Sequence, residues 1–274
     1  MISVYTKAGP LGFKSLVFPD GQPHIEFHPH VLEFTEVTIE TEIASTNDLF
    51  VVQLLADVLR RLGYTSINLD IRYLMGARMD RVMTPTSPFT LDIVARTLNG
   101  LGLNRVRIFD PHSDAAVKLI NHAYGVRPTK IVRNIMRTLE GPLVCAPDKG
   151  AHTRTMNICG VVDILGNKIR EAATGKLSHF TAESLTIRPS DLDSRPILIV
   201  DDLCDGGGTF LGLAEVLKKK YPARDLYLYV SHGIFSKGIE QLKKVFKGIY
   251  TTDSYPRVED ANLFVKPLRM ETAE

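Results

Sequence analysis

The residues best suited to chemistry lie in one segment, residues 197–210, which reads ILIVDDLCDGGGTF. Its first four residues, Ile197 to Val200, are branched and apolar and predict a buried parallel strand. Two acids, Asp201 and Asp202, follow directly. A loop of small residues comes next, made of Asp205, Gly206, Gly207, Gly208 and Thr209. The apolar spacing after this loop predicts a helix over residues 210–220.

A glycine-rich turn between a strand and a helix can hold a phosphate group. Backbone N–H groups of such a turn converge on one point, and the N-terminus of the helix adds partial positive charge. Carboxylates at the tip of the strand, here Asp201 and Asp202, can hold ribose hydroxyls or a hydrated Mg2+. The same glycines could do no more than allow tight packing, but the acid pair directly before them favours the phosphate site.

Composition excludes several other classes of protein. The chain has 274 residues, which fits one large or two medium domains, and its net charge of +2 provides no strong field for nucleic acid. No apolar run approaches the roughly 18 residues that a membrane-spanning helix needs, and the N-terminus has no signal-peptide core. The cysteines Cys145, Cys159 and Cys204 favour buried thiols in a reducing compartment over disulfides or a zinc site. We therefore expect a cytoplasmic protein that binds neither nucleic acid nor a membrane.

Strand and helix patterns alternate along the chain, which favours an α/β fold with mainly parallel sheets flanked by helices. The pattern falls into two halves, residues 1–130 and 131–274, and polar residues stand at strand ends in both. The predicted strands are 67–73, 105–109, 143–146, 197–200, 226–230 and 249–252, and the predicted helices are 49–62, 89–101 and 210–220. The helix over residues 49–62 has Asn47 or Asp48 as its expected cap.

Four polar clusters mark the first half. They are the turn at residues 18–22, the helix entry at 45–48, the strand end at 73–81 and the loop at 110–113, which read FPDGQ, STND, YLMGARMDR and DPHS. Read alone, the first is a turn, the second is a capped helix, and the histidine of the fourth is most often solvated. The third follows a strand, at the edge where open α/β sheets bind ligands.

Residues 197–210 resemble the phosphoribosyl-binding signature that type I phosphoribosyltransferases share with ribose-phosphate pyrophosphokinases, also called PRPP synthetases. In that signature two acids precede a small loop that ends in Gly-Gly-Thr or similar. The four clusters of the first half, in this order, are similar to the N-terminal domain of PRPP synthetases, and phosphoribosyltransferases lack this set. The resemblance covers residues 15–256 and implies two phosphoribosyltransferase-like domains, an ATP-side domain over 1–130 and a catalytic domain over 131–274.

The resemblance implies an ATP site in the first half. Phe18 and Arg78 would sandwich the adenine by stacking and cation–π contact, and Asp20 would accept from its amino group. His112 would contact the Mg2+ on the β- and γ-phosphates. The implied ATP-binding set is Phe18, Asp20, Gln22, Arg78, Asp80 and His112. The family has glutamate where this chain has Gln22, and glutamine where it has Met79, which weakens the case for strict adenine preference.

In the second half, residues 147–151 (PDKGA) resemble the pyrophosphate loop of the family. Asp148 would be the second Mg2+ ligand, and backbone N–H groups of Lys149, Gly150 and Ala151 would bind pyrophosphate oxygens. Residues 168–170 match the family's Lys-x-Arg on a catalytic flap, and alternation along a strand would bring Lys168 and Arg170 to one face. Outside the resemblance, Lys-x-Arg is usually a solvated strand face. Lys176 is the alternative flap cation.

The implied reaction transfers the β,γ-diphosphoryl group of MgATP to the anomeric hydroxyl of a 5-phosphoribose and releases AMP. Asp201 and Asp202 would hold the ribose hydroxyls and a metal, residues 205–209 the 5-phosphate, and Lys168 and Arg170 the charge that develops on the transferred group. Relatives usually carry threonine where this chain has Gly206. The glycine is expected to open space there, so that ADP-ribose as well as ribose 5-phosphate could be the acceptor, giving ADP-ribose pyrophosphate for NAD metabolism.

Two other functions remain open from the sequence. One is a phosphoribosyltransferase that consumes PRPP, against which the ATP-side residues of the first half argue. The other is a catalytically silent regulatory subunit derived from the family, against which the intact acids and flap cations argue. For the leading reading we expect Mg2+ as cofactor, MgATP and a ribose-phosphate as substrates, and a homo-oligomer that is a dimer or a multiple of dimers.

Overall fold

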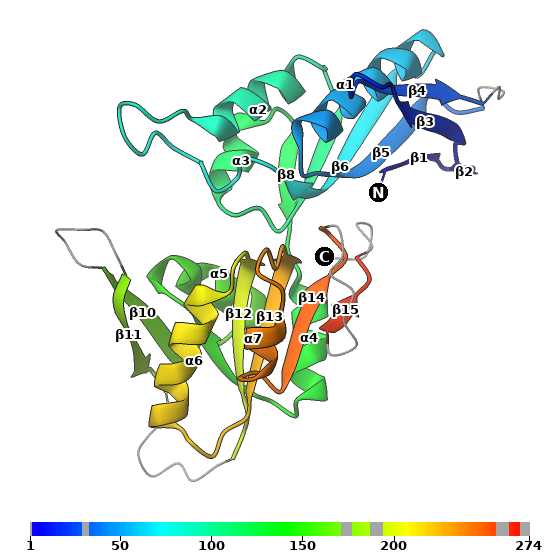
Figure 1. Cartoon of the computed structure of the whole chain (residues 1–274). Helices are drawn as coiled ribbons and strands as arrows, with labels where there is room; N and C mark the ends of the chain where they lie inside the picture. The colour runs from blue at the N-terminus through cyan, green and yellow to red at the C-terminus, as the bar shows by residue number, and fades with distance from the viewer. Residues whose placement is uncertain (1, 29–32, 171–176, 187–193, 256–262, 269–274) are drawn as a thin grey trace. The chain divides into compact units, whose positions relative to one another are not determined.

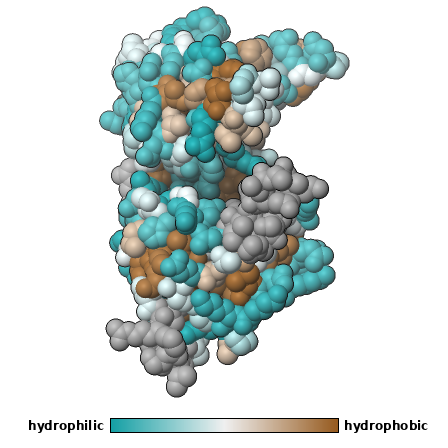
Figure 2. Space-filling view, turned by 90° about the vertical axis from the view of Figure 1, so that its left-hand side faces the viewer, coloured by the Kyte–Doolittle hydropathy of each residue, from teal (hydrophilic) through white to brown (hydrophobic). Residues whose placement is uncertain are grey.

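The computed structural model describes residues 2–28, 33–170, 177–186, 194–255 and 263–268 (Figure 1). The chain divides into two compact units, residues 1–126 and 127–274, and each is described by itself. Both units are built on a sheet that is mainly parallel and flanked by helices, as the alternating sequence pattern predicts. On both units, the face seen in Figure 2 is mostly hydrophilic, with hydrophobic residues in separate patches.

Unit 1 contains a six-stranded sheet with the strand order β2-β1-β5-β6-β7-β8. Its strands are β1 (Ile2–Thr6), β2 (Gly9–Pro10), β5 (Glu36–Ile43), β6 (Ser66–Leu74), β7 (Arg105–Phe109) and β8 (Ala123–Val126). Strands β5 to β8 are parallel, and β1 and β2 are antiparallel additions at one edge. A separate hairpin of β3 (Phe13–Val17) and β4 (Pro23–Phe27) packs against a helix by way of β4.

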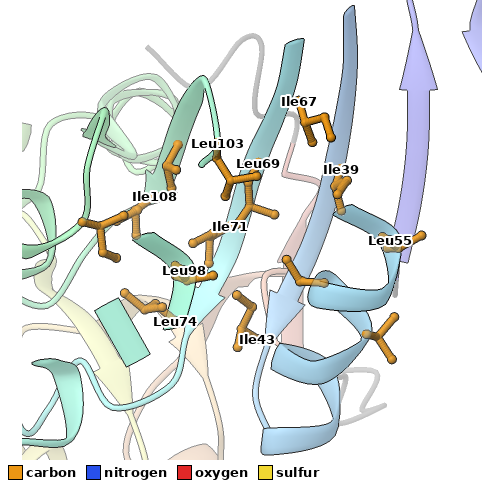
Figure 3. Packing of buried hydrophobic residues seen from close by; sticks show 14 of the residues in the cluster. Ile39, Ile43, Leu55, Ile67, Leu69, Ile71, Leu74, Leu98, Leu103 and Ile108 are labelled. Atoms are coloured by element: carbon orange, nitrogen blue, oxygen red, sulfur yellow. The ribbon is translucent and has the colours of Figure 1, made fainter. Parts of the chain in front are cut away.

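The helices of unit 1 are α1 (Thr46–Arg61), α2 (Thr90–Asn99) and α3 (Asp114–Leu119). Strands β5 to β8 follow one another across the sheet in chain order, so right-handed crossovers carry all three helices to the same face. Figure 3 shows this core: Ile39, Leu69 and Ile108 of the sheet face Leu55 of α1 and Leu98 of α2. All five side chains are fully or almost fully buried.

Helix α1 begins earlier than the sequence predicts. Its N-cap is Ser45, whose Oγ accepts from the backbone N–H of Asp48 at 3.2 Å, while Asp48 Oδ2 accepts from the backbone N–H of Ser45 at 2.7 Å. This reciprocal capping box satisfies two backbone donors at once. The expectation that Asn47 or Asp48 caps the helix was therefore wrong, because the hydroxyl that completes the box lies at residue 45.

Unit 2 contains a seven-stranded sheet with the order β11-β10-β9-β12-β13-β14-β15, in which only β10 and β11 are antiparallel. Its strands are β9 (Leu143–Ala146), β10 (Ile164–Arg170), β11 (Leu177–Ser184), β12 (Ile197–Cys204), β13 (Leu226–Gly233), β14 (Gly248–Thr252) and β15 (Leu263–Lys266). Its helices are α4 (Thr129–Thr138), α5 (Lys149–Cys159), α6 (Gly208–Lys220) and α7 (Glu240–Lys243).

Strand β12 is buried on both sides, as its unbroken run of branched residues predicts. Ile197 and Ile199 pack into the same cluster as α6, whereas Leu198 and Val200 pack into the cluster that contains residues of α4 and α5. Successive side chains of a strand point to opposite faces, so helices cover both faces of this sheet. The strand extends to Cys204 instead of ending at Val200, because its later residues pair with β13, for example Cys204 with Gly233.

The three cysteines are buried and free, as their number and spacing predict. Burial raises the pKa of the Cys204 thiol to about 12, so this thiol stays protonated near neutral pH. None of the helices in the described ranges has the length and hydropathy needed to cross a membrane.

Candidate active site

The strand order of unit 2 places two candidate loops at one edge of the sheet. Strands β9 and β12 are adjacent and parallel. After β9 the chain passes through α5 to β10 on one side, and after β12 it passes through α6 to β13 on the other side. Loops that leave neighbouring strands in opposite directions open a crevice at the carboxyl ends of the strands, where open α/β sheets bind ligands. The loop after β9 and the loop after β12 therefore lie on the two sides of a topological switch point of this kind, at one edge of the sheet.

The acid pair lies within β12, at this edge. Asp202 is only 6% exposed, and Asp201 is partly buried and accepts a hydrogen bond from the backbone N–H of Asp202 at 3.0 Å on its Oδ1. Burial, and next the charge of Asp202, raise the pKa of Asp201 well above its usual range. Two carboxylates held this close repel each other and favour a ligand that brings a cation or hydroxyl donors.

Arg154 of α5 is a charged neighbour that the sequence analysis missed. Its guanidinium is the main opposing influence on Asp201, since it lowers the pKa that burial and Asp202 raise. Helix α5 is held against β12 by Thr155, whose Oγ1 donates to the carbonyl of Val200 at 3.3 Å. The available signal was a basic residue a turn and a half into a helix that starts at a strand-end loop.

The loop after β12 has the geometry of a phosphate site. Gly207 is the N-cap of α6 and has a φ of 77°, a left-handed conformation that favours glycine. The first helical hydrogen bond runs from the N–H of Leu211 to the carbonyl of Gly207 at 3.0 Å. The N–H groups of the preceding first-turn residues therefore have no partner within the helix and are placed to bind an anion.

The expectation that Gly206 opens space beside this loop was wrong. A β carbon at Gly206 would lie 3.3 Å from Cδ and 3.4 Å from Cε of Lys237, so the aliphatic part of that lysine already fills the position. Gly208 differs, because a β carbon there would have nothing within 4 Å. The turn at residues 234–238, which is distant in the sequence, thus lies beside the phosphate loop and contacts it through Lys237.

The loop after β9 leads directly into α5. Asp148 is the N-cap of this helix, and its Oδ1 accepts from the N–H of Ala151 at 3.0 Å. The N–H of Ala151, expected to bind pyrophosphate, is thus already used by the cap. Lys149 and Gly150 are exposed in the first turn of the helix, where backbone N–H groups lack helical partners.

The expected catalytic flap is an antiparallel hairpin of β10 and β11, in which Lys168 pairs with Phe180 and Arg170 with Leu177. The register shifts between Ile169 and Arg170. The expectation that Lys168 and Arg170 share one face assumes regular alternation along the strand. A bulge of this kind interrupts that alternation. The side chains of Lys168 and Arg170, and the whole of Lys176, lie outside the described residues.

The expected adenine residues of the first hairpin lie in the turn between β3 and β4. Asp20 Oδ1 accepts from the backbone N–H of Gln22 at 3.1 Å, and the N–H of Phe18 donates to the carbonyl of Gln22 at 2.9 Å. The Phe18 ring is 42% exposed, with its centroid 5.6 Å from that of His24. The turn therefore presents an aromatic face that a flat apolar ring could cover.

The other expected ATP residues follow β6 and β7, which are adjacent and parallel. Arg78 is exposed after β6, with Asp80 Oδ1 at 3.8 Å from Arg81 Nε, and His112 is exposed just after β7. His112 follows Asp110, a buried residue in the left-handed region with a φ of 42°. The carboxyl ends of neighbouring parallel strands bring these two loops to one edge of the sheet.

The hairpin turn and the loop after β6, which contain Phe18 and Arg78, belong to different parts of unit 1. In Figure 1 the β3–β4 hairpin lies at one end of the unit, and the cyan loop that joins β6 to α2 and contains Arg78 lies at the other. The hairpin packs against α1 by way of β4, whereas the loop after β6 leads into α2.

Known proteins similar to this chain are ribose-phosphate pyrophosphokinases. No protein-family model matches the chain. The chain is 30% identical over 244 residues to the ribose-phosphate pyrophosphokinase of Thermococcus kodakarensis, a match that covers 87% of this chain and 84% of the relative. It is 28% identical over 255 residues to the ribose-phosphate pyrophosphokinase of Pyrococcus abyssi, covering 87% and 82%. The fold resembles a crystal structure of phosphoribosylpyrophosphate synthetase from Mycobacterium smegmatis, with a TM-score of 0.77, 18% identity, and coverage of 94% and 86%.

Proposed function

The chain belongs to the ribose-phosphate pyrophosphokinase family and is a diphosphokinase of that type, and we propose that it transfers the β,γ-diphosphoryl group of ATP to the anomeric hydroxyl of ribose 5-phosphate. The products are 5-phosphoribosyl 1-diphosphate (PRPP) and AMP. The observation that carries the proposal is the strand order of unit 2, which brings the acid pair and phosphate loop of β12 to the same sheet edge as the loop after β9. One loop suits a ribose phosphate and the other suits a diphosphate.

The reaction needs little from the protein beyond positioning and charge. The anomeric oxygen attacks the β-phosphorus of ATP, the bond between that phosphorus and the oxygen bridging it to the α-phosphorus breaks, and AMP leaves while the hydroxyl proton is released. Asp201 and Asp202 orient the ribose, and the amide groups at the start of α6 hold its 5-phosphate. Lys168 and Arg170 neutralise the charge on the transferred group.

Mg2+ suits the donor chemistry of the acids at this edge, although the described residues contain no group of three or more His, Cys, Asp or Glu side chains that could hold a metal ion by themselves. Asp148, Asp201 and Asp202 each carry hard oxygen donors, which Mg2+ prefers, and would hold the ion together with phosphate oxygens of ATP. The metal would supply neutralisation of the phosphate oxygens of ATP. In unit 1, the exposed imidazole of His112 stays the predicted contact of the Mg2+ on the β- and γ-phosphates of ATP.

Exchange of Asp148 for asparagine is expected to raise the Mg2+ concentration needed for half-maximal activity by about tenfold, through loss of an anionic ligand. Asparagine caps helices about as well as aspartate, so the melting temperature should stay close to that of the wild type. Asp148→Ala, which loses the cap as well, is the comparison. Activity against Mg2+ and thermal melting measure both effects. An asparagine variant that melts earlier but keeps the wild-type Mg2+ dependence would make Asp148 a structural residue.

The adenine site supports a homo-oligomer. The β3–β4 hairpin and the loop after β6 lie at opposite ends of unit 1 (Figure 1), so an adenine bound by both Phe18 and Arg78 would take the hairpin of one copy and the loop of another. A dimer, or a multiple of dimers, provides such pairs by symmetry. Three buried free cysteines support a cytoplasmic location, because a reducing compartment keeps thiols unpaired.

ADP-ribose is a second candidate acceptor, because three consecutive glycines, residues 206–208, leave the middle of the phosphate loop without side chains. A phosphodiester would have room beside Gly208, and the lysine over Gly206 is a flexible side chain. Transfer to ADP-ribose would give ADP-ribose pyrophosphate.

Incubation with MgATP and each acceptor, followed by mass spectrometry, tests the function. We expect AMP together with an acceptor heavier by one diphosphate. Faster reaction of ribose 5-phosphate assigns PRPP synthesis, and faster reaction of ADP-ribose assigns the second candidate. Release of pyrophosphate from PRPP in the presence of a nucleobase, without AMP formation, would instead identify a phosphoribosyltransferase. No turnover in any mixture would identify a silent subunit.

A further inference from the structure

The turn between β13 and α7 is fixed against the phosphate loop. The backbone N–H groups of Ile234 and Phe235 both donate to the carbonyl of Cys204, at 2.9 and 3.0 Å. Ser236 Oγ donates to Asp205 Oδ1 at 2.6 Å. Phe235 is 3% exposed and has a φ of 48°, a left-handed conformation that costs free energy in any residue other than glycine. A strained, buried anchor and three hydrogen bonds therefore hold this turn in one place.

The next residue of the turn, Lys237, lies across Gly206. Its Cγ, Cδ and Cε would be 3.6, 3.3 and 3.4 Å from a β carbon at that glycine. The ammonium is one bond beyond Cε, so it lies beside the loop that receives the phosphate. The side chain is exposed, and its ammonium forms no ion pair with any described residue. The charge is therefore available to a ligand.

The electrostatics of the loop call for such a cation. Asp201 and Asp202 lie at the end of β12, and Asp205 starts the loop itself. A phosphate placed at the N-terminus of α6 would be repelled by these acids. The helix supplies amide groups and partial charge, but Gly206 supplies no hydroxyl. A lysine acts on phosphate as a compact point charge that needs no fixed fork geometry.

We propose that Lys237 binds the phosphoryl group on the 5-carbon of the acceptor ribose and takes the place of the side chain that Gly206 lacks. The assignment rests on the proposed function for the identity of the acceptor. It makes Lys237 a binding residue, which holds the acceptor before and during transfer and takes no part in the transfer itself. Its effect should appear in acceptor binding, whether that phosphoryl group is a monoester or part of a diphosphate.

The test compares Lys237→Met with Lys237→Arg and with the control Lys219→Met. Methionine keeps the apolar stem over Gly206 and removes only the charge, and Lys219 is an exposed lysine near the far end of α6 that pairs with Glu215. We expect Lys237→Met to raise KM for the acceptor at least about tenfold, the size of one lost charged hydrogen bond. Its kcat and its KM for ATP should change less than about twofold, and Lys237→Arg and Lys219→Met should stay near wild type.

Isothermal titration separates failure of this inference from failure of the proposed function. Ribose 5-phosphate, ADP-ribose and inorganic phosphate are each titrated into wild type and Lys237→Met without ATP. Weaker binding of any of them to the variant supports the lysine, even if turnover is absent, and the acceptor with the larger loss is the one whose phosphate it holds. Equal binding of all three by both proteins, with unchanged KM, overturns the inference.

A double variant tests whether Lys237 takes the place of the side chain that Gly206 lacks. Gly206 is outside the left-handed region, so threonine is compatible with its backbone, and the shorter alanine at 237 removes the stem that threonine would meet. Gly206→Thr combined with Lys237→Ala should recover part of the acceptor binding that Lys237→Ala loses alone. If the double variant melts like the single variant but recovers no acceptor binding, then a side chain at residue 206 cannot replace Lys237, which counts against the proposal.

Discussion

Replacement of Lys168 or Arg170 with alanine is expected to lower kcat by about a hundredfold or more, with a much smaller change in KM for ATP or acceptor. The negative charge on the transferred diphosphoryl group develops most fully in the transition state, and a cation on the flap acts mainly at that point. Removing such a group therefore slows turnover more than it weakens substrate binding.

Steady-state kinetics with both substrates varied separate the two effects, with Lys219→Ala as a control for loss of an exposed lysine. The double variant of Lys168 and Arg170 should lose much less than the product of the single losses, because residues that act on one group are not additive. Unchanged kcat in both single variants would show that the flap cations are misassigned and would direct attention to Lys176.

The local arrangement of the site could be predicted because it depends on neighbouring residues. A run of branched residues, then acids, glycines and an amphipathic pattern, leads to a strand, a loop and a helix, and β12 and α6 follow this order. The boundaries were less accurate. Pairing with β13 extends β12 to Cys204, and the hydroxyl of Ser45 moves the start of α1.

The order of the strands could not be predicted from the sequence, because it depends on contacts between distant segments. The loops after β9 and β12 meet at a switch point because β10 and β13 lie on opposite sides of that pair. The contact of Lys237 with Gly206 has the same origin, since β13 must lie beside β12 before the turn after it can reach the loop. For the same reason, a glycine that indicated open space in the sequence is covered in the structure.

The acid pair is expected to support activity while it lowers the stability of the folded protein. The variant Asp201→Asn separates these two effects. Without substrates, the variant is expected to melt at a higher temperature than the wild type near neutral pH, although its kcat/KM falls about a hundredfold for want of a charged ligand to ribose and metal. An asparagine oxygen can still accept from the N–H of Asp202, so the local hydrogen bond is kept. What disappears is the cost of keeping the Asp201 carboxyl group protonated below its raised folded pKa, or of burying its charge beside a second carboxylate above it.

The pH dependence follows from the raised pKa of Asp201 in the folded protein. Below the ordinary carboxyl pKa the group is protonated in both states and has no effect on stability. As the pH rises from that value to the raised folded pKa, the unfolded chain releases its proton and the folded chain keeps it, so the wild type loses stability. The difference in melting temperature between Asp201→Asn and wild type should therefore be small near pH 4 and grow toward neutral pH.

Thermal melting across this pH range, with Asp57→Asn as the control, decides the matter. Asp57 is an exposed carboxylate paired with Arg61 one helical turn away, and its exchange removes only a weak surface ion pair. Addition of MgATP and acceptor should stabilise the wild type more than Asp201→Asn, because bound cations and ribose hydroxyls relieve the repulsion that the empty site bears. If Asp201→Asn melts below the wild type at neutral pH, the surroundings stabilise the carboxylate. The Asp201 carboxylate then contributes to the stability of the fold, and the prediction is wrong.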